Sequence, residues 1–272
     1  MSRMLLSFAG SLLIVVLGAG NLVYAQEQVE KGKDQALAQM QLKDVRIEAQ
    51  SIGQLFSNLS LSYRTPVGVE MAFDDNDLST YRVEFKKGTL SELLTQFFTQ
   101  HDEYAWEIKE GVVRIYPTGN HRDAVVDELL ETQIGSLYIK EGSGCSLLED
   151  SIANSAEVKS LLKANGVTYH QGDFSGFYFP QLGERFRLDV SNITVREILN
   201  KVIKESPLAK MWVIKRYGTD QTLHINFSAN FDENPRKYGD PAQMIDPAVW
   251  DELKSGRNAD ANTRGLSRIL CK

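Results

Sequence analysis

Hydrophobic and polar positions follow the same pattern twice along this chain, about a hundred residues apart. Residues 80–85 (TYRVEF) and 185–190 (RFRLDV) place apolar side chains at every second position, as in a strand buried on one face. The segments that follow, KGTLSELLTQFF (87–98) and SNITVREILNKVI (191–203), have apolar residues at i, i+3, i+4, i+7 and i+8. This spacing predicts a helix with one buried stripe in each segment.

The start of each helix carries the same signal. A shift of 105 residues places Thr89 on Thr194 and Glu92 on Glu197. Each T-x-x-E pair predicts a capping box, in which the hydroxyl and the carboxylate bind free backbone N–H groups at the helix start.

The flanking segments extend the repeat. Each helix precedes a strand-like run centred on a tryptophan, Trp106 or Trp212, and closing strands are expected over 112–116 and 222–227. Upstream, Ser51-x-x-Gln54 predicts a further capped helix, with a weaker counterpart around 158–162, and first strands are expected over 45–47 and 137–139. The order is strand, helix, strand, strand, helix, strand, strand, twice.

This order predicts an α+β fold of two tandem small modules, each a short sheet with two helices, plus a C-terminal tail with a short helix. The expected divisions are a signal peptide (1–25), an N-terminal lead (26–43), a first module (44–117), a linker with a short helix (118–134), a second module with insertions (135–228) and a tail (229–272).

The N-terminus has the three parts of a secretory signal peptide. Arg3 is followed by an apolar run over 4–18, and Val23-Tyr24-Ala25 has the small residues of a cleavage site. We expect cleavage near Ala25 and a periplasmic or secreted protein. No later window approaches ~18 consecutive apolar residues, so no membrane span is expected in the mature chain.

Composition and charge mainly exclude certain partners and cofactors. The 272 residues carry a formal charge of −6, and the lysines and arginines are scattered, which argues against a nucleic-acid partner. Two cysteines and four scattered histidines are too few for a convincing metal site, and no cofactor is expected.

The cysteine pair has two interpretations. In an oxidising compartment, Cys145 and Cys271 predict one disulfide that ties the tail to the second module. Gly142-Ser143-Gly144-Cys145-Ser146 also has the look of a nucleophile loop, but none of His121, His170 and His224 lies in a recognisable signature around it. Ser146-x-x-Glu149 is an alternative helix start that explains the loop composition, so no catalytic residue is assigned.

Two other segments invite a binding role. The run Asp74-Asp75-Asn76-Asp77 offers oxygen ligands for Ca²⁺ but lacks the glycine and distal glutamate of an EF-hand, and a turn explains it equally. The 172–184 insertion and the tail helix form a candidate binding surface, and the alternative interpretation is that both cover the core. Its residues are Phe174, Phe177, Tyr178, Phe179 and Trp250.

The order of elements resembles the short N-terminal domain of secretins and TonB-dependent receptors, the STN-type domain. The segment from Val45 to Tyr116 carries the resemblance well, with Phe73-Asp74 and Lys87 to Leu94 in characteristic places, and Ser136 to Phe227 carries it less well. The second copy has Asn192 where the family pattern has glycine. The chain has neither the barrel nor the secretin core of those proteins.

The resemblance implies a non-enzymatic protein that binds cell-envelope proteins, as an adaptor or accessory component of a secretion, pilus or receptor-signalling assembly. The residues leave two alternatives open. One is a small-molecule or glycan binding module that uses an aromatic-lined groove in the second module, with Tyr169 beside the aromatic insertion. The other is an enzyme with a site between the modules. The oligomeric state and the identity of the partner are not predicted.

Overall fold

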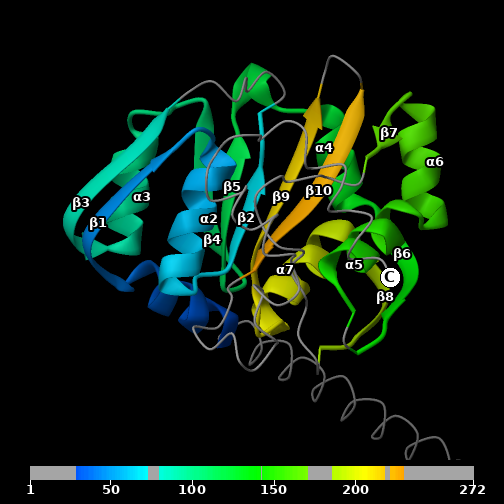
Figure 1. Ribbon diagram of the computed structural model, residues 1–272, viewed down its shortest axis with the longest axis horizontal. Coiled ribbons are helices and arrows are strands. Elements are labelled where there is room, and N and C mark those ends of the chain that lie inside the picture. The colour runs from blue at the N-terminus through cyan, green and yellow to red at the C-terminus, as the bar shows by residue number, and fades with distance from the viewer. Residues whose placement is uncertain (1–28, 73–79, 142, 171–185, 218–220, 230–272) are drawn as a thin grey trace, which may run out of the picture.

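A six-stranded mixed sheet runs through the middle of the computed structural model (Figure 1). The structure describes residues 29–72, 80–141, 143–170, 186–217 and 221–229. In spatial order the strands are β4 (Tyr104–Lys109), β5 (Val112–Pro117), β2 (Val67–Glu70), β9 (Ala209–Tyr217), β10 (Thr222–Ala229) and β7 (Thr168–Tyr169). The first three come from residues 41–117, called the first half, and the others from residues 133–229, called the second half.

In the first half, two helices lie between this sheet and a two-stranded ribbon. The antiparallel ribbon consists of β1 (Gln41–Ala49) and β3 (Tyr81–Thr89), and the helices are α2 (Ile52–Tyr63) and α3 (Leu90–Phe98). The rings of Phe56 on α2 and Phe98 on α3 stack with centroids 5.7 Å apart. A further helix over residues 29–38 precedes β1.

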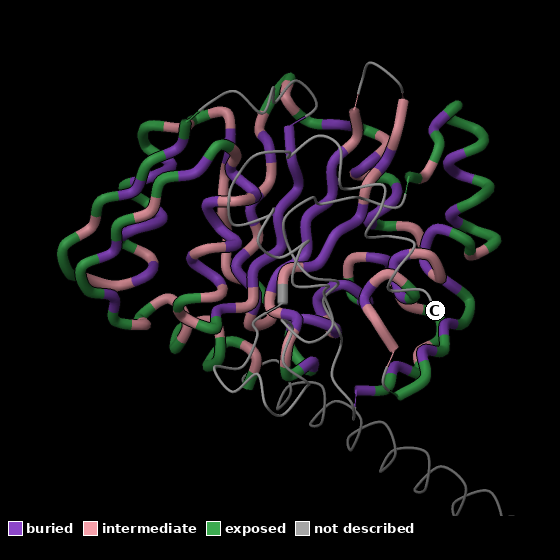
Figure 2. Tube along the Cα trace, in the orientation of Figure 1, coloured by how far each residue is buried: buried purple, intermediate pink, exposed green. Residues whose placement is uncertain are grey.

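The second half repeats this layering with an additional helix. Its ribbon pairs β6 (Gln133–Ile139) with β8 (Leu188–Thr194). The helices are α5 (Cys145–Ala153), α6 (Ala156–Ala164) and α7 (Val195–Glu205). The core of this half is a continuous apolar cluster, and the strands of the central sheet are mostly buried while α6 keeps an exposed side (Figure 2).

The two halves lie on opposite faces of the shared sheet. Met211 and Val213 of β9 pack into the core of the first half, whereas Trp212 and Ile214 pack into the core of the second. Strands β5, β2 and β9 are parallel, and β4, β10 and β7 run the other way. The order β4-β5-β2 therefore repeats as β9-β10-β7 after a half-turn about an axis across the strands, which explains the change of face.

Capping residues set the helix starts as the sequence predicts. Thr89 with Glu92, and Thr194 with Glu197, form complete capping boxes. Ser51 also accepts a hydrogen bond from the Gln54 N–H, at 3.1 Å. The capping box expected at Ser146 is wrong: α5 begins at Cys145, its N-cap is Gly144, which has no side chain to form a cap, and Glu149 is buried.

The fold is α+β, as the sequence predicts. The prediction of two modules is not confirmed, because the central sheet is continuous across both halves through the parallel pairing of β2 with β9. The expected linker holds a short 3₁₀ turn, η1 (Gly119–His121), and the expected helix, α4 (Ala124–Glu131). Val126, Leu129 and Leu130 of α4 are fully buried, so this segment belongs to the core of the second half.

No helix in the described part of the chain is long and apolar enough to cross a membrane. The expected signal peptide and most of the C-terminal tail lie outside the described residues.

Candidate functional site

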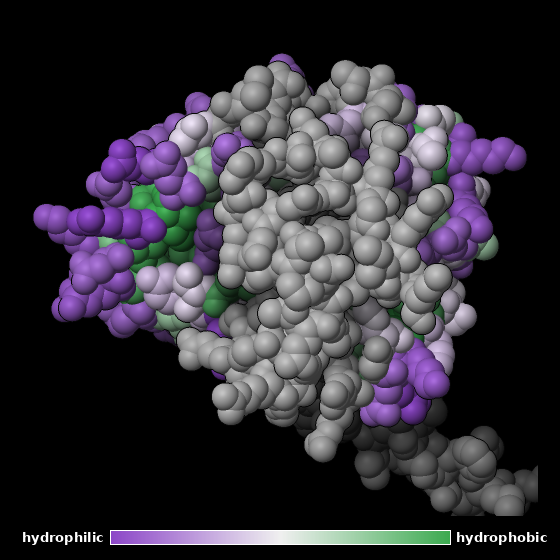
Figure 3. Space-filling view, in the orientation of Figure 1, coloured by the Kyte–Doolittle hydropathy of each residue, from purple (hydrophilic) through white to green (hydrophobic). Residues whose placement is uncertain are grey.

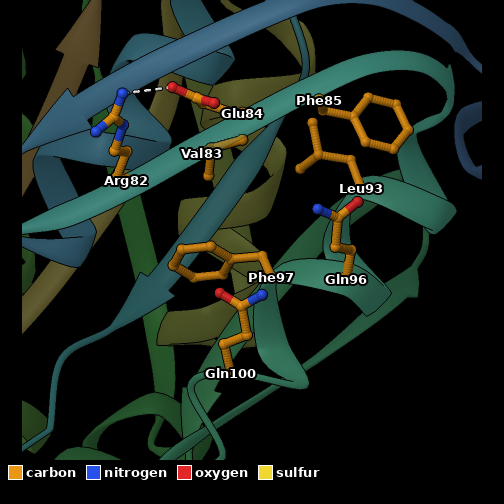
Figure 4. A pocket seen from close by; sticks show the side chains of 8 residues that line it. All are labelled: Arg82, Val83, Glu84, Phe85, Leu93, Gln96, Phe97 and Gln100. Atoms are coloured by element: carbon orange, nitrogen blue, oxygen red, sulfur yellow. Dashed lines mark hydrogen bonds and ion pairs between the residues drawn. The ribbon is translucent and has the colours of Figure 1, made fainter.

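An open groove runs along the outer edge of the first-half ribbon, between β3 and α3 (Figure 4). Its volume is about 540 Å³. The lining consists of four consecutive residues of β3 and four residues from α3 and the turn after it: Arg82, Val83, Glu84, Phe85, Leu93, Gln96, Phe97 and Gln100. In Figure 4 the side chains of Val83, Leu93 and Phe97 point into the space between strand and helix. These three side chains form an apolar floor, but they are buried, and most of the exposed lining of the groove is polar.

The strand side of the groove is an unpaired backbone edge. The Leu90 N–H donates to the Met40 carbonyl at 2.9 Å, which fixes the alternation of hydrogen bonds along β1 and β3. Because the bonded positions alternate, Arg82 and Glu84 bond to β1, while the N–H and C=O groups of Val83 and Phe85 point away from it. No described strand pairs with this edge.

The helix side of the groove is polar but uncharged. Gln96 and Gln100 are exposed and border the groove. After the 105-residue shift, their counterparts in the second half are Lys201 and Glu205, which form an ion pair at 2.5 Å. The two glutamines are thus a difference between the halves at otherwise matching positions.

The outer face of the ribbon carries charged side chains that form ion pairs with one another. Arg82 pairs with Glu84 at 2.5 Å, and the shifted positions Arg187 and Asp189 pair at 3.1 Å. Figure 3 shows hydrophobic surface beside the first-half ribbon, framed by hydrophilic side chains. Apolar surface bordered by polar residues is typical of sites that receive another molecule.

The buried environment of Cys145 does not suit a nucleophilic cysteine. Its side chain is fully buried in the second-half core, and burial, followed by the nearby Glu149 carboxylate, raises the pKa of its thiol well above the usual value. A reactive cysteine needs the opposite, an accessible thiol with a lowered pKa. Cys145 is a free cysteine in the structure, and Cys271 lies outside the described residues, so the disulfide stays a prediction.

Glu149 is a buried carboxyl on α5, one turn after Cys145. Only 6% of it is exposed. Burial, and to a lesser extent the charge of Asp150, raises its pKa to about 8, although a hydrogen bond from the Phe227 backbone N–H opposes the shift. The carboxyl is therefore mostly protonated at neutral pH.

This pKa predicts that stability falls as pH rises. An acid whose folded pKa exceeds its unfolded value stabilises the fold below the unfolded pKa and loses that contribution as pH rises through the folded pKa. For Glu149 the expected loss between pH 6 and pH 8 is about 2 kcal/mol. Urea unfolding of Glu149→Gln, which keeps an acceptor for Phe227, should show this slope largely removed. An unchanged slope would assign it to other groups.

The histidines do not surround Cys145. His170 and His224 contact each other, with ring centroids 5.2 Å apart, and Tyr217 contacts His224 at 5.0 Å. His224 alternates with Leu223 and Ile225, which face the second-half core, so its ring lies on the opposite side of β10 from Cys145. Among the described residues, no group of three or more His, Cys, Asp or Glu side chains could hold a metal ion.

Of the other predicted binding residues, Tyr169 lies in the described part of the chain. Tyr169 packs against the second-half core, and its pKa is raised by burial and by the charges of Glu149 and Asp150. The aromatic insertion and tail residues, and the acidic run Asp74 to Asp77, lie outside the described residues: Phe174, Phe177, Tyr178, Phe179 and Trp250.

The sequence pattern identified the floor of the groove as core but missed the groove itself. Leu93 and Phe97 were expected on the buried stripe and are buried. The signal that could have revealed the site is the contrast between Gln96 and Gln100 and their charged counterparts in the second half.

No protein-family model, curated protein or solved structure matches this chain. The resemblance to STN-type domains therefore stays a prediction, carried by the residues quoted for it.

Proposed function

We propose that this protein is an exported, non-enzymatic protein–protein interaction module. It binds an extended segment of a cell-envelope protein in the groove between β3 and α3. The observation that carries this proposal is a groove with an apolar floor and a polar rim, beside the Val83 and Phe85 backbone edge with which no described strand pairs. Strand addition to a sheet edge is a recurring mode of peptide recognition.

Two parts of the groove would contribute to recognition in different ways: the strand edge to affinity and the floor to side-chain preference. Backbone groups of an added strand would pair with Val83 and Phe85 and supply affinity that depends little on sequence. Alternate side chains of that strand would enter the groove over Leu93 and Phe97, which favours apolar residues at every second position. The uncharged amides of Gln96 and Gln100 offer donors and acceptors without demanding an ion pair.

Export and the envelope partner are supported by the N-terminal pattern around Arg3 and Ala25 and by the STN-type resemblance. In the described part of the chain, apolar side chains from both halves pack against the two faces of the shared sheet. A role as adaptor or accessory component suits such a protein.

Selection from a library of displayed random peptides tests the binding function. The purified chain is used to select binders from a library of extended peptides, and their affinities are measured by fluorescence anisotropy. We expect peptides with alternating apolar residues. The double substitution Gln96→Lys and Gln100→Glu, which introduces the charges of the second half, should weaken them about tenfold or more, because charges at the rim must be desolvated.

The matched control is the reverse change in the second half, Lys201→Gln with Glu205→Gln, which should leave binding unchanged. Urea unfolding of each variant verifies the fold. Selection of no peptide, or of peptides that bind the Gln96/Gln100 variant equally well, would exclude the groove as the binding site.

A further inference from the structure

Strand β4 forms an outer edge of the central sheet, and its counterpart in the second half, β9, does not. Each strand begins a hairpin, follows a capped helix and carries a tryptophan, Trp106 in β4 and Trp212 in β9. The chain completes β9 by pairing it with β2 in parallel. The described part of the chain provides no strand for the equivalent side of β4.

Hydrogen-bond alternation shows which backbone groups β4 presents. The Thr118 N–H donates to the Glu103 carbonyl at 2.8 Å, and Lys109 faces Val112 across the hairpin turn. Odd-numbered residues of β4 therefore bond to β5, and the N–H and C=O groups of Trp106 and Ile108 point outward.

The turn that ends this edge is firmly held. Glu110 and Gly111 both have positive φ values, 57° and 73°, as a tight hairpin turn requires. Their N–H groups donate to the Asp34 carboxylate at 3.2 and 2.5 Å.

The edge has few of the features that protect edge strands from pairing. Prolines, bulges, inward-pointing charges and edge lysines serve that purpose, and of these the described β4 carries only Lys109. The β4–β5 register is continuous over all its pairs, from Tyr104 to Lys109, and β4 has no proline. Trp106 and Ile108 point toward the first-half core and are partly buried at its margin.

We propose that β4 pairs in antiparallel fashion with β4 of a second copy of this chain, about a two-fold axis through Ile108. In this register Glu107 of each copy opposes Lys109 of the other on the same face of the sheet. Lys109 is exposed and makes no ion pair within the described residues. The Glu107 carboxylate forms an ion pair with Arg114, whose Nη1 lies 2.6 Å from Glu107 Oε1.

Charge complementarity selects this register over its neighbour. An axis through Glu107 would oppose the two Glu107 carboxylates directly, and like charges in opposed positions destabilise a strand pair. The Ile108 axis instead produces two symmetric Glu–Lys pairs and the mutual hydrogen bonds of the two Ile108 residues. Pairing is limited to residues 107–109 of each copy, because the next outward N–H, that of Glu110, is donated to Asp34. The interface is isologous, so it closes as a dimer and does not extend into a fibre. It uses residues separate from the β3–α3 groove and does not depend on the proposed peptide binding.

Charge reversal tests the dimer. Sedimentation equilibrium of the purified chain over a range of concentrations should show a monomer–dimer equilibrium. Lys109→Glu and Glu107→Lys should each weaken dimerisation about tenfold or more, because each places like charges opposite one another. An equimolar mixture of the two variants should restore a heterodimer, in which both cross-strand pairs again have opposite signs. The double variant should restore the homodimer.

Restored association in the mixture shows that the single variants lose the interface and not the fold. This control is needed because Glu107→Lys also removes the partner of Arg114. A wild-type chain that stays monomeric at its highest soluble concentration would overturn the proposal. So would a dimer that is insensitive to both substitutions, or single variants that fail to associate when mixed.

Discussion

Replacing Arg196 by methionine is expected to lower the free energy of unfolding by about 3–5 kcal/mol, because it leaves a buried carboxylate without its counter-ion. Glu70, at the end of β2, is only 3% exposed. Arg196 Nη1, from α7, lies 2.5 Å from Glu70 Oε1, and its Nε lies 2.9 Å from Glu131 Oε1 at the end of α4. The guanidinium thus joins the first half to the second.

The expected loss depends on pH. Burial already raises the pKa of Glu70, and the Arg196 charge opposes that shift. Without Arg196 the carboxyl should bind a proton more readily, so the variant should be less destabilised at pH 5 than at pH 8. Urea unfolding at both pH values measures the difference.

Two further variants separate the two partners of Arg196. Glu131→Gln should cost no more than about 1 kcal/mol, because that carboxylate is largely exposed. Arg196→Met combined with Glu70→Gln should be more stable than Arg196→Met alone, because no buried charge is then left unpaired. A loss well under 1 kcal/mol for Arg196→Met would show that the pair contributes little.

Local chemistry explains which elements the sequence could predict. Thr89 and Glu92, like Thr194 and Glu197, are three residues apart and satisfy backbone groups of their own helix, so their pattern has the same meaning in any fold. The alternation over 80–85 also depends only on neighbours along the chain. These elements appear in the structure where the pattern placed them.

Contacts between distant segments could not be predicted in the same way. Nothing in the sequence of β2 indicates that it pairs with β9, about 145 residues later, rather than ending its own sheet. The α4 segment was expected as a linker because its apolar residues alone do not show what they pack against. Glu149 was assigned to a cap because S-x-x-E has that meaning at an exposed helix start, whereas burial gives the carboxyl a different environment.

The candidate groove could be predicted from the sequence only in part. Periodicity shows that Phe97 belongs to a buried stripe, but the groove exists because α3 lies beside a ribbon edge with which no described strand pairs. That arrangement depends on tertiary packing. The difference between Gln96 and Lys201 was visible in the sequence, but it gained meaning only when the strand edge beside it was located.

Replacing Gly68 by alanine is expected to destabilise the junction of the two halves by about 3 kcal/mol or more, an effect at the upper end for one added methyl group. Gly68 of β2 lies opposite Trp212 of β9. A Cβ atom at Gly68 would lie 2.2 Å from Cζ2 and 2.4 Å from Cε2 of the Trp212 ring. The indole has no room to retreat: it is fully buried, and its Nε1 donates to Asn200 Oδ1 at 2.9 Å.

Gly53 provides a matched control for the same change. A Cβ atom there would meet the flexible Met71 sulfur at 3.3 Å, and alanine favours the helix that Gly53 occupies, so Gly53→Ala should be close to neutral. Trp212→Leu alone should also destabilise the fold, since it vacates a buried site. Because Gly68 and Trp212 touch, their combined cost should be clearly smaller than the sum of the single costs. Additive costs in urea unfolding would mean that the β2–β9 junction does not depend on this close approach.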